Sequence, residues 1–202
     1  MNSPKIRLLK NIILLLSSLR LLPHIMFLFF CKNRNIIAYE VDRWIQLGGN
    51  NMTTKLTKFV FLMTTLPEFR NLFYYRAGYF SRLFGFMCPR MKTLFIATPV
   101  IGEGLYIQHG FSTIIAAESI GKDCWVNQQV TIGFSNNTDR PILKDNVVVS
   151  AGAKIIGKVT VNSNSKIGAN AVVVKNVPEN CTVVGVPAYI VRRNGIKTLE
   201  QL

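Results

Sequence analysis

Aliphatic residues return at every sixth position along the C-terminal half of the chain, over residues 95–178. A first run of these anchors ends at Ile132 and contains one single-residue slip, and a second run, starting at Leu143, keeps strict register. A period of six fits neither an α-helix nor the alternation of an ordinary strand. It is typical of the hexapeptide repeat of a parallel β-helix, in which short strands stack coil upon coil around a column of anchors. The series reads Phe95, Ile101, Ile107, Ile114, Ile120, Val126, Ile132, Leu143, Val149, Ile155, Val161, Ile167 and Val173.

The N-terminal half has helical patterning instead. Residues 36–48 predict an amphipathic helix that ends at a Gly-Gly pair. Residues 55–66 and 68–85, rich in Phe, Leu and Tyr, predict two more helices with Pro67 between them. The apolar face expected for the first helix consists of Ile37, Val41, Trp44 and Ile45.

Residues 8–30 form the most apolar stretch of the chain. A transmembrane helix needs about twenty apolar residues, but Arg20, Pro23 and His24 interrupt this one. A charge at the centre of a span costs about 3 kcal/mol, and the proline favours two short helices. We expect them to be buried or to lie at an oligomer interface, with contact to a membrane surface as the alternative. His24 is expected to be structural.

The net charge of +14 lies mostly in the N-terminal half, where residues 1–92 hold fourteen basic and three acidic side chains. Such a surface suits nucleic acid, an anionic membrane or an anionic substrate. No nucleic-acid-binding motif accompanies it, so a nucleic-acid partner is not expected. Four scattered cysteines and two histidines predict reduced thiols in a cytosolic protein and no metal site. The cysteines are Cys31, Cys88, Cys124 and Cys181.

Three features depart from the repeat and attract functional interest. His109 lies outside the anchor column in an early coil. Residues 134–142 contain a five-residue insertion, which predicts a loop that leaves the helical surface. After Val173 the pattern breaks at residues 175–178 and again at 184–188.

Five segments carry a resemblance to a known family: IGEGLYIQHG, GKDCWVNQQVTIG, VVVSAGAKIIGKVTV, SKIGANAVVVKNVP and VVGVPAYIV. Over residues 95–193 the chain resembles the hexapeptide-repeat acyltransferases, in particular their serine acetyltransferase-like branch. The resemblance implies a mainly β fold, a left-handed parallel β-helix with an N-terminal α-helical cap. Residues 1–92 would form the cap and oligomerisation region, and residues 93–202 the acetyltransferase domain with a C-terminal tail.

The resemblance also implies acetyl-CoA as co-substrate and no metal. It implies homotrimers, or dimers of trimers, with active sites between neighbouring subunits. His109 matches the position of the catalytic base, a role that suits an imidazole. Ala151 and Ala169 match positions whose backbone binds the pantetheine arm of CoA. Lys175 and Arg192, with Arg193 beside it, are the expected partners of the CoA phosphates.

The chain departs from serine-making members at the acceptor contacts. Gln108 stands where those members have an Asp before the catalytic His, and residues 91–100 contain no acid. Arg140 is present in the extruded loop, but the histidine that follows it in those members is missing. Gln108, Glu118 and Arg140 are therefore the candidate substrate contacts. Glu103, Glu118 or a backbone carbonyl remain as groups that could orient His109.

Three functions follow as expectations. The first is an acetyl-CoA-dependent O-acetyltransferase whose acceptor hydroxyl belongs to a sugar or polysaccharide precursor. The second is a serine O-acetyltransferase that makes O-acetylserine for cysteine biosynthesis, and the third is a non-catalytic trimeric scaffold. The expected location is the cytoplasm, with a peripheral position at the inner membrane face as the alternative.

Overall fold

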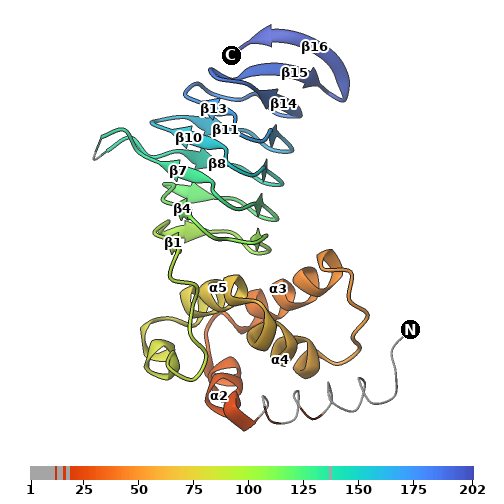
Figure 1. Cartoon of the computed structure of the whole chain (residues 1–202), viewed down its shortest axis with the longest axis vertical. Coiled ribbons are helices and arrows are strands. Elements are labelled where there is room, and N and C mark those ends of the chain that lie inside the picture. Colours follow the sequence, from red (N-terminus) through yellow and green to blue (C-terminus); the bar gives the residue numbers. More distant parts are fainter. Residues whose placement is uncertain (1–11, 13–15, 17–18, 137) are drawn as a thin grey trace. The chain divides into compact units, whose positions relative to one another are not determined.

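The computed structural model describes residues 12, 16, 19–136 and 138–202. The chain divides into two compact units, Met1–Arg90 and Met91–Leu202. We call them the helical unit and the coil unit (Figure 1).

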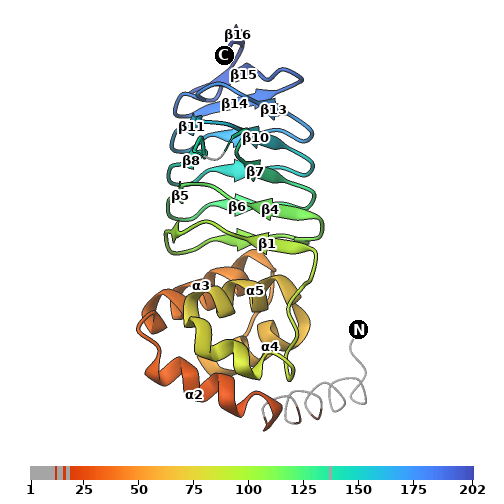
Figure 2. The same ribbon diagram turned by 90° about the vertical axis from the view of Figure 1, so that its left-hand side faces the viewer.

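The coil unit is a parallel β-helix built from three sheets (Figure 2). Each of the first four coils contributes one short strand to each sheet, and the last coil contributes strands to the first and third sheets. The first sheet consists of β1 (Leu94–Ile96), β4 (Thr113–Ile115), β7 (Thr131–Gly133), β10 (Lys154–Ile156) and β13 (Val172–Val173). The second consists of β2 (Val100–Ile101), β5 (Ser119–Ile120), β8 (Ile142–Leu143) and β11 (Thr160–Val161). The third contains β3 (Tyr106–Ile107), β6 (Trp125–Val126), β9 (Val148–Val149), β12 (Lys166–Ile167) and β14 (Cys181–Val184). It continues antiparallel through β15 (Tyr189–Arg193) and β16 (Ile196–Gln201).

The anchors predicted from the period of six fill the interior, with two exceptions. Eleven of the thirteen are buried, from Ile101 onwards. Phe95 and Ile114 were expected inside, but 59% and 44% of their surfaces are exposed, and their neighbours Leu94 and Ile115 are buried instead. Phe95 pairs with Ile114, and it is Ile115 that pairs with the buried anchor Ile132. The spacings from Ile96 to Ile101 and from Ile115 to Ile120 are five residues instead of six. Since side chains alternate in a strand, this one-residue difference turns Phe95 and Ile114 outward.

The insertion leaves the helical surface as predicted. It connects β7 to β8 and projects from the side of the coils (Figure 1). Asp139 organises it by accepting hydrogen bonds from the backbone N–H groups of Ser135 and Asn136, at 2.9 and 2.8 Å. The Ser135 hydroxyl also donates to this carboxylate, and these hydrogen bonds hold the pKa of Asp139 below its usual range.

The helical unit contains α2 (Leu22–Phe30), α3 (Arg34–Leu47), α4 (Lys55–Thr65), α5 (Pro67–Ala77) and the 3₁₀ segment η1 (Tyr79–Phe84). The predicted apolar face of α3 is buried as expected. The single helix predicted over residues 68–85 is wrong, because it breaks into α5 and η1 at Gly78. The φ angle of Gly78 is 85°, a left-handed conformation that an α-helix cannot continue through.

A buried hydrogen-bond chain ties α2 to α5. The Tyr74 hydroxyl has one proton, which it donates to the Cys88 carbonyl at 3.0 Å. Tyr74 must therefore accept from Nε2–H of His24, 2.7 Å away, which leaves Nδ1 as the unprotonated nitrogen. Nδ1 is buried and has no hydrogen-bond partner. His24 thus acts as a structural residue, as expected.

Arg76 and Glu40 form a second buried link in this unit. Their side chains are only 5% and 1% exposed, and Nη2 of Arg76 lies 2.6 Å from Oε1 of Glu40. Removing one partner of such a pair is costly because the other charge remains buried. The pair therefore fixes α3 against α5.

The apolar stretch 8–30 is described only from residue 19 onwards and at two earlier positions, so the first of its two predicted helices lies outside the described residues. Within the described chain, no helix is both long and apolar enough to cross a membrane. All four cysteines are free thiols.

The buried His24 predicts a stability that depends on pH. Burial, followed by the positive charge of Arg20, lowers the pKa of His24 from 6.5 to about 4. The unfolded chain therefore binds this proton more readily than the folded chain between these values. The free energy of unfolding should fall by roughly 2–3 kcal/mol as pH drops from about 6.5 to about 4.

Urea unfolding followed by circular dichroism, at neutral pH and near pH 5, measures this effect. In His24→Gln, the decrease in the free energy of unfolding that is due to His24 should disappear. The decrease that is due to protonation of carboxylates should remain. An unchanged pH dependence in the variant would contradict the assignment to His24.

Candidate active site

The registers of the coils align one corner of the β-helix into a column. The corner follows the third-sheet strand of each coil, and its segments are residues 108–112, 127–130, 150–153, 168–171 and 185–188. We call it the His109 corner. Backbone hydrogen bonds connect its levels, as from Gln129 N to Phe111 O at 3.0 Å and from Asn170 N to Ala151 O at 2.9 Å. Residues of one level therefore stand directly beside those of the next.

His109 occupies the first level of this corner, directly after β3. Its φ of 64° is left-handed, which is uncommon for a residue other than glycine, asparagine or aspartate. The side chain is exposed, and no described side chain hydrogen-bonds to its ring. The backbone N–H of neighbouring Gln108 donates to Val126 O at 2.9 Å, which fixes the strand end before the turn. The imidazole is thus held by its backbone and is open to a ligand.

Ala151 and Ala169 stand at the same place in later coils. Val149 pairs with both Val126 and Ile167, and each of the two alanines lies two residues after its paired strand residue, as His109 lies two after Ile107. The structure therefore brings these three predicted site residues into one column. Four coil spacings of about 4.8 Å separate the first level from the last, a span of roughly 19 Å.

Small residues keep this column narrow. Gly152, next to Ala151, has a φ of 73°, and a Cβ there would lie 2.0 Å from Oδ1 of Asn170. A side chain at this position would displace the side chain of Asn170 and would be strained by the left-handed φ. Lys154 adds a positive charge nearby, since its Nζ donates to Gln129 O at 2.6 Å.

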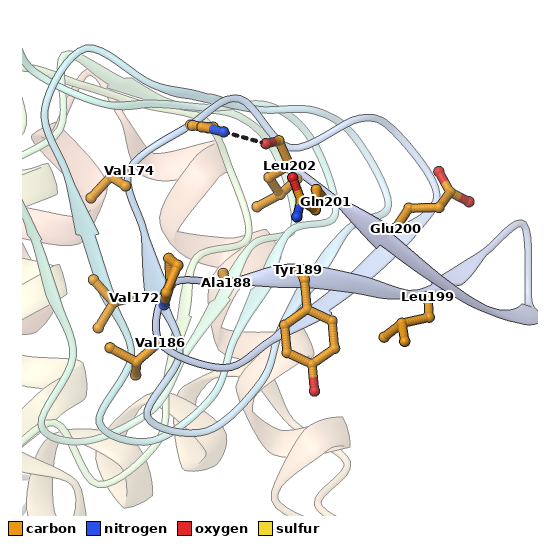
Figure 3. A pocket seen from close by; sticks show the side chains of 11 residues that line it. Val172, Val174, Val186, Ala188, Tyr189, Leu199, Glu200, Gln201 and Leu202 are labelled. Atoms are coloured by element: carbon orange, nitrogen blue, oxygen red, sulfur yellow. Dashed lines mark hydrogen bonds between the residues drawn. The ribbon is translucent and has the colours of Figure 1, made fainter.

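The last level of the column opens into a cavity of about 760 Å³ (Figure 3). Its wall is mostly apolar, and Tyr189 and the residues of the final strand close it from the tail. Lys175 lies at its edge and donates to the Leu202 carbonyl at 2.6 Å. The wall consists of Val172, Val174, Lys175, Val186, Pro187, Ala188, Tyr189, Leu199, Glu200, Gln201 and Leu202.

The acceptor candidates other than Gln108 lie at a different corner. Glu118 and Arg140 meet where the projecting loop rejoins the coils, since Glu118 N donates to Pro141 O at 2.8 Å. The guanidinium of Arg140 lies 5.4 Å from the ring centroid of Phe134 in the same loop. A cation stacked on an aromatic ring keeps a fixed orientation. Within one chain, these groups are separated from His109 by the width of the first sheet.

Neither carboxylate considered as the orienting partner of His109 lies in its corner. Glu103 pairs with Lys122 at 3.0 Å in the corner that follows the second sheet, and this hydrogen bond raises the pKa of Lys122. Glu118 lies at the loop. Of the three expected orienting groups, these positions argue against the two carboxylates within one chain.

The residues predicted to bind the CoA phosphates lie at different places in the structure. Lys175 lines the cavity at the end of the His109 corner, whereas Arg192 lies across β14, where it pairs with Thr182 and borders a second cavity of about 730 Å³. Arg193 is bound to Glu200, with 2.6 Å between its Nη2 and the carboxylate. Only Lys175 is thus placed where the column ends.

The sequence analysis did not identify Lys154 as a neighbour of the His109 corner or Tyr189 as part of the cavity wall. Lys154 directly precedes the anchor Ile155 and resembles any solvated lysine, so nothing in the sequence indicates its hydrogen bond to the corner. For Tyr189 the sequence did offer an indication, because the VVGVPAYIV segment that contains it breaks the six-residue repeat. Among the described residues, no group of three or more histidine, cysteine, aspartate or glutamate side chains could hold a metal ion.

Comparisons with known proteins agree on one group of enzymes. No protein-family model matches the chain. The serine acetyltransferase of Synechococcus elongatus is 40% identical over 101 residues, which are 48% of this chain and 41% of that protein. That of Staphylococcus aureus is 41% identical over 101 residues, 48% of this chain and 47% of that protein. The chain thus spans less than half the length of the curated relatives it matches.

Solved structures extend the similarity beyond the coils. A serine O-acetyltransferase from Brucella melitensis superposes with a TM-score of 0.64 at 23% identity, covering 79% of this chain and 69% of that one, which shows the fold. A Neisseria gonorrhoeae serine acetyltransferase in complex with serine gives 0.60 at 28% identity, covering 77% and 67%. A serine acetyltransferase in complex with CoA gives 0.61 at 26% identity, covering 78% and 69%.

These likenesses confirm the predicted left-handed parallel β-helix with helices on its N-terminal side. The chain is a hexapeptide-repeat protein that is similar to the serine acetyltransferases in the sequence of its coils and in its fold.

Proposed function

We propose that this protein is an acetyl-CoA-dependent O-acetyltransferase with His109 as general base. The observation that carries the proposal is the column that runs from His109 past Ala151 and Ala169 to the cavity beside Lys175. An extended ligand lying along this column would place its thioester at His109 and its far end at the cavity. The solved relative that contains CoA supports this choice of co-substrate.

The chemistry follows from the exposed imidazole. His109 takes the proton of the acceptor hydroxyl, and the oxygen attacks the thioester carbonyl carbon. The tetrahedral intermediate collapses by breaking the carbon–sulfur bond, and the departing CoA thiolate receives the proton from the imidazolium. General base catalysis of this kind contributes about 10²–10⁴-fold to the rate.

L-serine is the acceptor we propose first. The sequence alone favoured a sugar or polysaccharide precursor, but the curated relatives are serine acetyltransferases, and one solved relative contains serine. A hydroxyl on a sugar remains the second candidate for a specific reason. Gln108 is neutral, and no carboxylate lies in the His109 corner to receive the ammonium group of serine.

A neighbouring copy would complete the acceptor site. Glu118 and Arg140 lie at the loop corner, away from His109 in the same chain, so they reach the imidazole only if another subunit supplies them. This separation supports the homotrimer implied by the resemblance, with a site at each subunit boundary. We place the helical unit in further oligomerisation only as an expectation.

His109→Asn is the sharpest test of the base. Asparagine tolerates the left-handed φ of this position, so the corner should keep its shape while the base is lost. Thiol release from acetyl-CoA, with L-serine or a sugar as acceptor, should fall by about 10²–10⁴-fold. Acetyl-CoA affinity, measured by calorimetry, should stay within a factor of about three. Undiminished turnover in the variant would refute the role of His109 as general base. If the wild-type protein does not bind acetyl-CoA, the non-catalytic trimeric scaffold is the function that the result supports.

The small residues of the column predict the position of the co-substrate. Ala169→Leu should raise KM for acetyl-CoA about tenfold with little change in kcat, because the larger side chain stands in the path of the ligand. Ala97→Leu is the matched control, since Ala97 is also exposed but lies after β1, outside the His109 corner. Equal effects of the two substitutions on KM would contradict the column.

The identity of the acceptor can be tested at Gln108. Gln108→Asp supplies a carboxylate beside His109 and should raise kcat/KM for L-serine about tenfold, since a charged hydrogen bond contributes about 1.5–3 kcal/mol. Asn164→Asp introduces the same charge at an exposed position in the corner that follows the second sheet, outside the His109 corner, and should have little effect. If Gln108→Asp lowers serine turnover and wild-type protein acetylates sugars, the second candidate is correct.

A further inference from the structure

The helical unit exposes apolar side chains on two neighbouring elements. On α2, Leu22, Met26, Phe29 and Phe30 are 51%, 60%, 70% and 85% exposed. Their spacing of four, three and one residues puts them on one face of the helix. The opposite face is used for packing, because it carries the buried His24. The exposed face is therefore left over by the fold of this unit.

The second element is η1 with the turn that follows it. Tyr79, Phe80, Leu83 and Phe86 are exposed, the last to 82%. This segment lies beside α2 in both views, and the rings of Phe27 and Phe84 are in contact, with centroids 5.6 Å apart (Figures 1 and 2). The eight side chains form what we call the aromatic surface. Soluble monomers rarely expose such a cluster without a partner.

Basic residues border this surface, and acids are missing from the segments that build it. The first thirty-nine residues contain no Asp or Glu, and neither do residues 69–102. Arg20, Lys32, Arg34 and Arg90 are exposed at the ends of α2 and after η1. The partner must therefore accept aromatic side chains and positive charge at the same time.

These two requirements distinguish a second copy of the chain from an anionic lipid surface as the partner. A second copy of the chain would bring two basic borders together, and like charges across an interface oppose association. An anionic lipid surface attracts the basic border, and its headgroup region accepts aromatic and aliphatic side chains. With nine residues, α2 is too short to span a bilayer, which needs about twenty.

We propose that the aromatic surface binds anionic membranes in the plane of the interface, with Phe29, Phe30 and Phe86 inserted among the headgroups. The basic residues at its border add electrostatic attraction. This inference does not rest on the proposed acetyl transfer, since it concerns only the helical unit.

Vesicle co-sedimentation of the full-length protein tests the proposal. We expect binding to phosphatidylcholine vesicles that contain roughly one-third phosphatidylserine, and release as salt is raised. Vesicles of phosphatidylcholine alone should bind at least about tenfold more weakly. Protein that stays in the supernatant with both kinds of vesicle would overturn the proposal.

Substitutions locate the binding surface. Phe30→Glu and Phe86→Glu should each weaken vesicle binding by about tenfold or more, because a negative charge replaces a ring that would be inserted among the lipid headgroups. Ile196→Glu should have no effect, because Ile196 is also largely exposed, at 73%, but lies on the coil unit. Both phenylalanines are exposed, so the folded state should survive, and circular dichroism checks this.

The contribution of the basic border to vesicle binding is tested with two double variants that change the net charge equally. Lys32→Gln/Arg34→Gln should weaken binding about twenty-five-fold, at about fivefold per charge. Lys158→Gln/Lys197→Gln makes the same change of net charge on the coils and should have little effect. Sedimentation velocity provides the opposing outcome. If Phe30→Glu dissociates an oligomer and leaves vesicle binding unchanged, the surface joins copies of this chain.

Discussion

Hydrogen bonding between stacked coils is the constraint on which the site depends. Each strand from β1 to β13 has only two or three residues, and it is held because its N–H and C=O groups pair with the neighbouring coils. The parallel register repeats from coil to coil, so residues at equivalent corners form columns. A site assembled from one column needs no long-range side-chain packing. The geometry of His109, Ala151 and Ala169 follows directly from strand pairings between valines and isoleucines.

Much of this architecture could be predicted from the sequence because the repeat is one-dimensional. A period of six determines which residues turn inward, and eleven of thirteen anchors are buried. The failures at Phe95 and Ile114 arise in the first two coils, where Ile96 and Ile115 lie five residues before the next anchor instead of six. A strict period of six cannot foresee this shorter spacing. The prediction of one helix over residues 68–85 was also wrong, because the chain adopts a left-handed φ at Gly78. The pattern of apolar residues contains no information about this local backbone conformation.

Candidate site residues were predictable to different degrees for a physical reason. His109 and the two alanines were proposed from the resemblance, and the backbone register of the coils places them at equivalent corners. Lys175 and Arg192 have long side chains near the tail, where β14, β15 and β16 turn antiparallel and leave the repeat. Beyond that point spacing no longer determines position, and the two residues lie at different cavities. The aromatic surface was visible in the sequence only as apolar composition, which does not distinguish a buried helix from one with an exposed face.

The same one-dimensional construction explains how the proposed donor column and a different acceptor contact could occur in one chain. In a stacked repeat each coil contacts only its neighbours, so a change at one level has little effect two levels away. Gln108 and the loop around Arg140 belong to the early coils, whereas Ala169 and the cavity belong to the late ones. If the proposed acetyl transfer is correct, the neutral Gln108 beside His109 can change which hydroxyl is accepted and leave the proposed donor path unchanged. On this argument, similarity along the whole column constrains the donor more strongly than it constrains the acceptor.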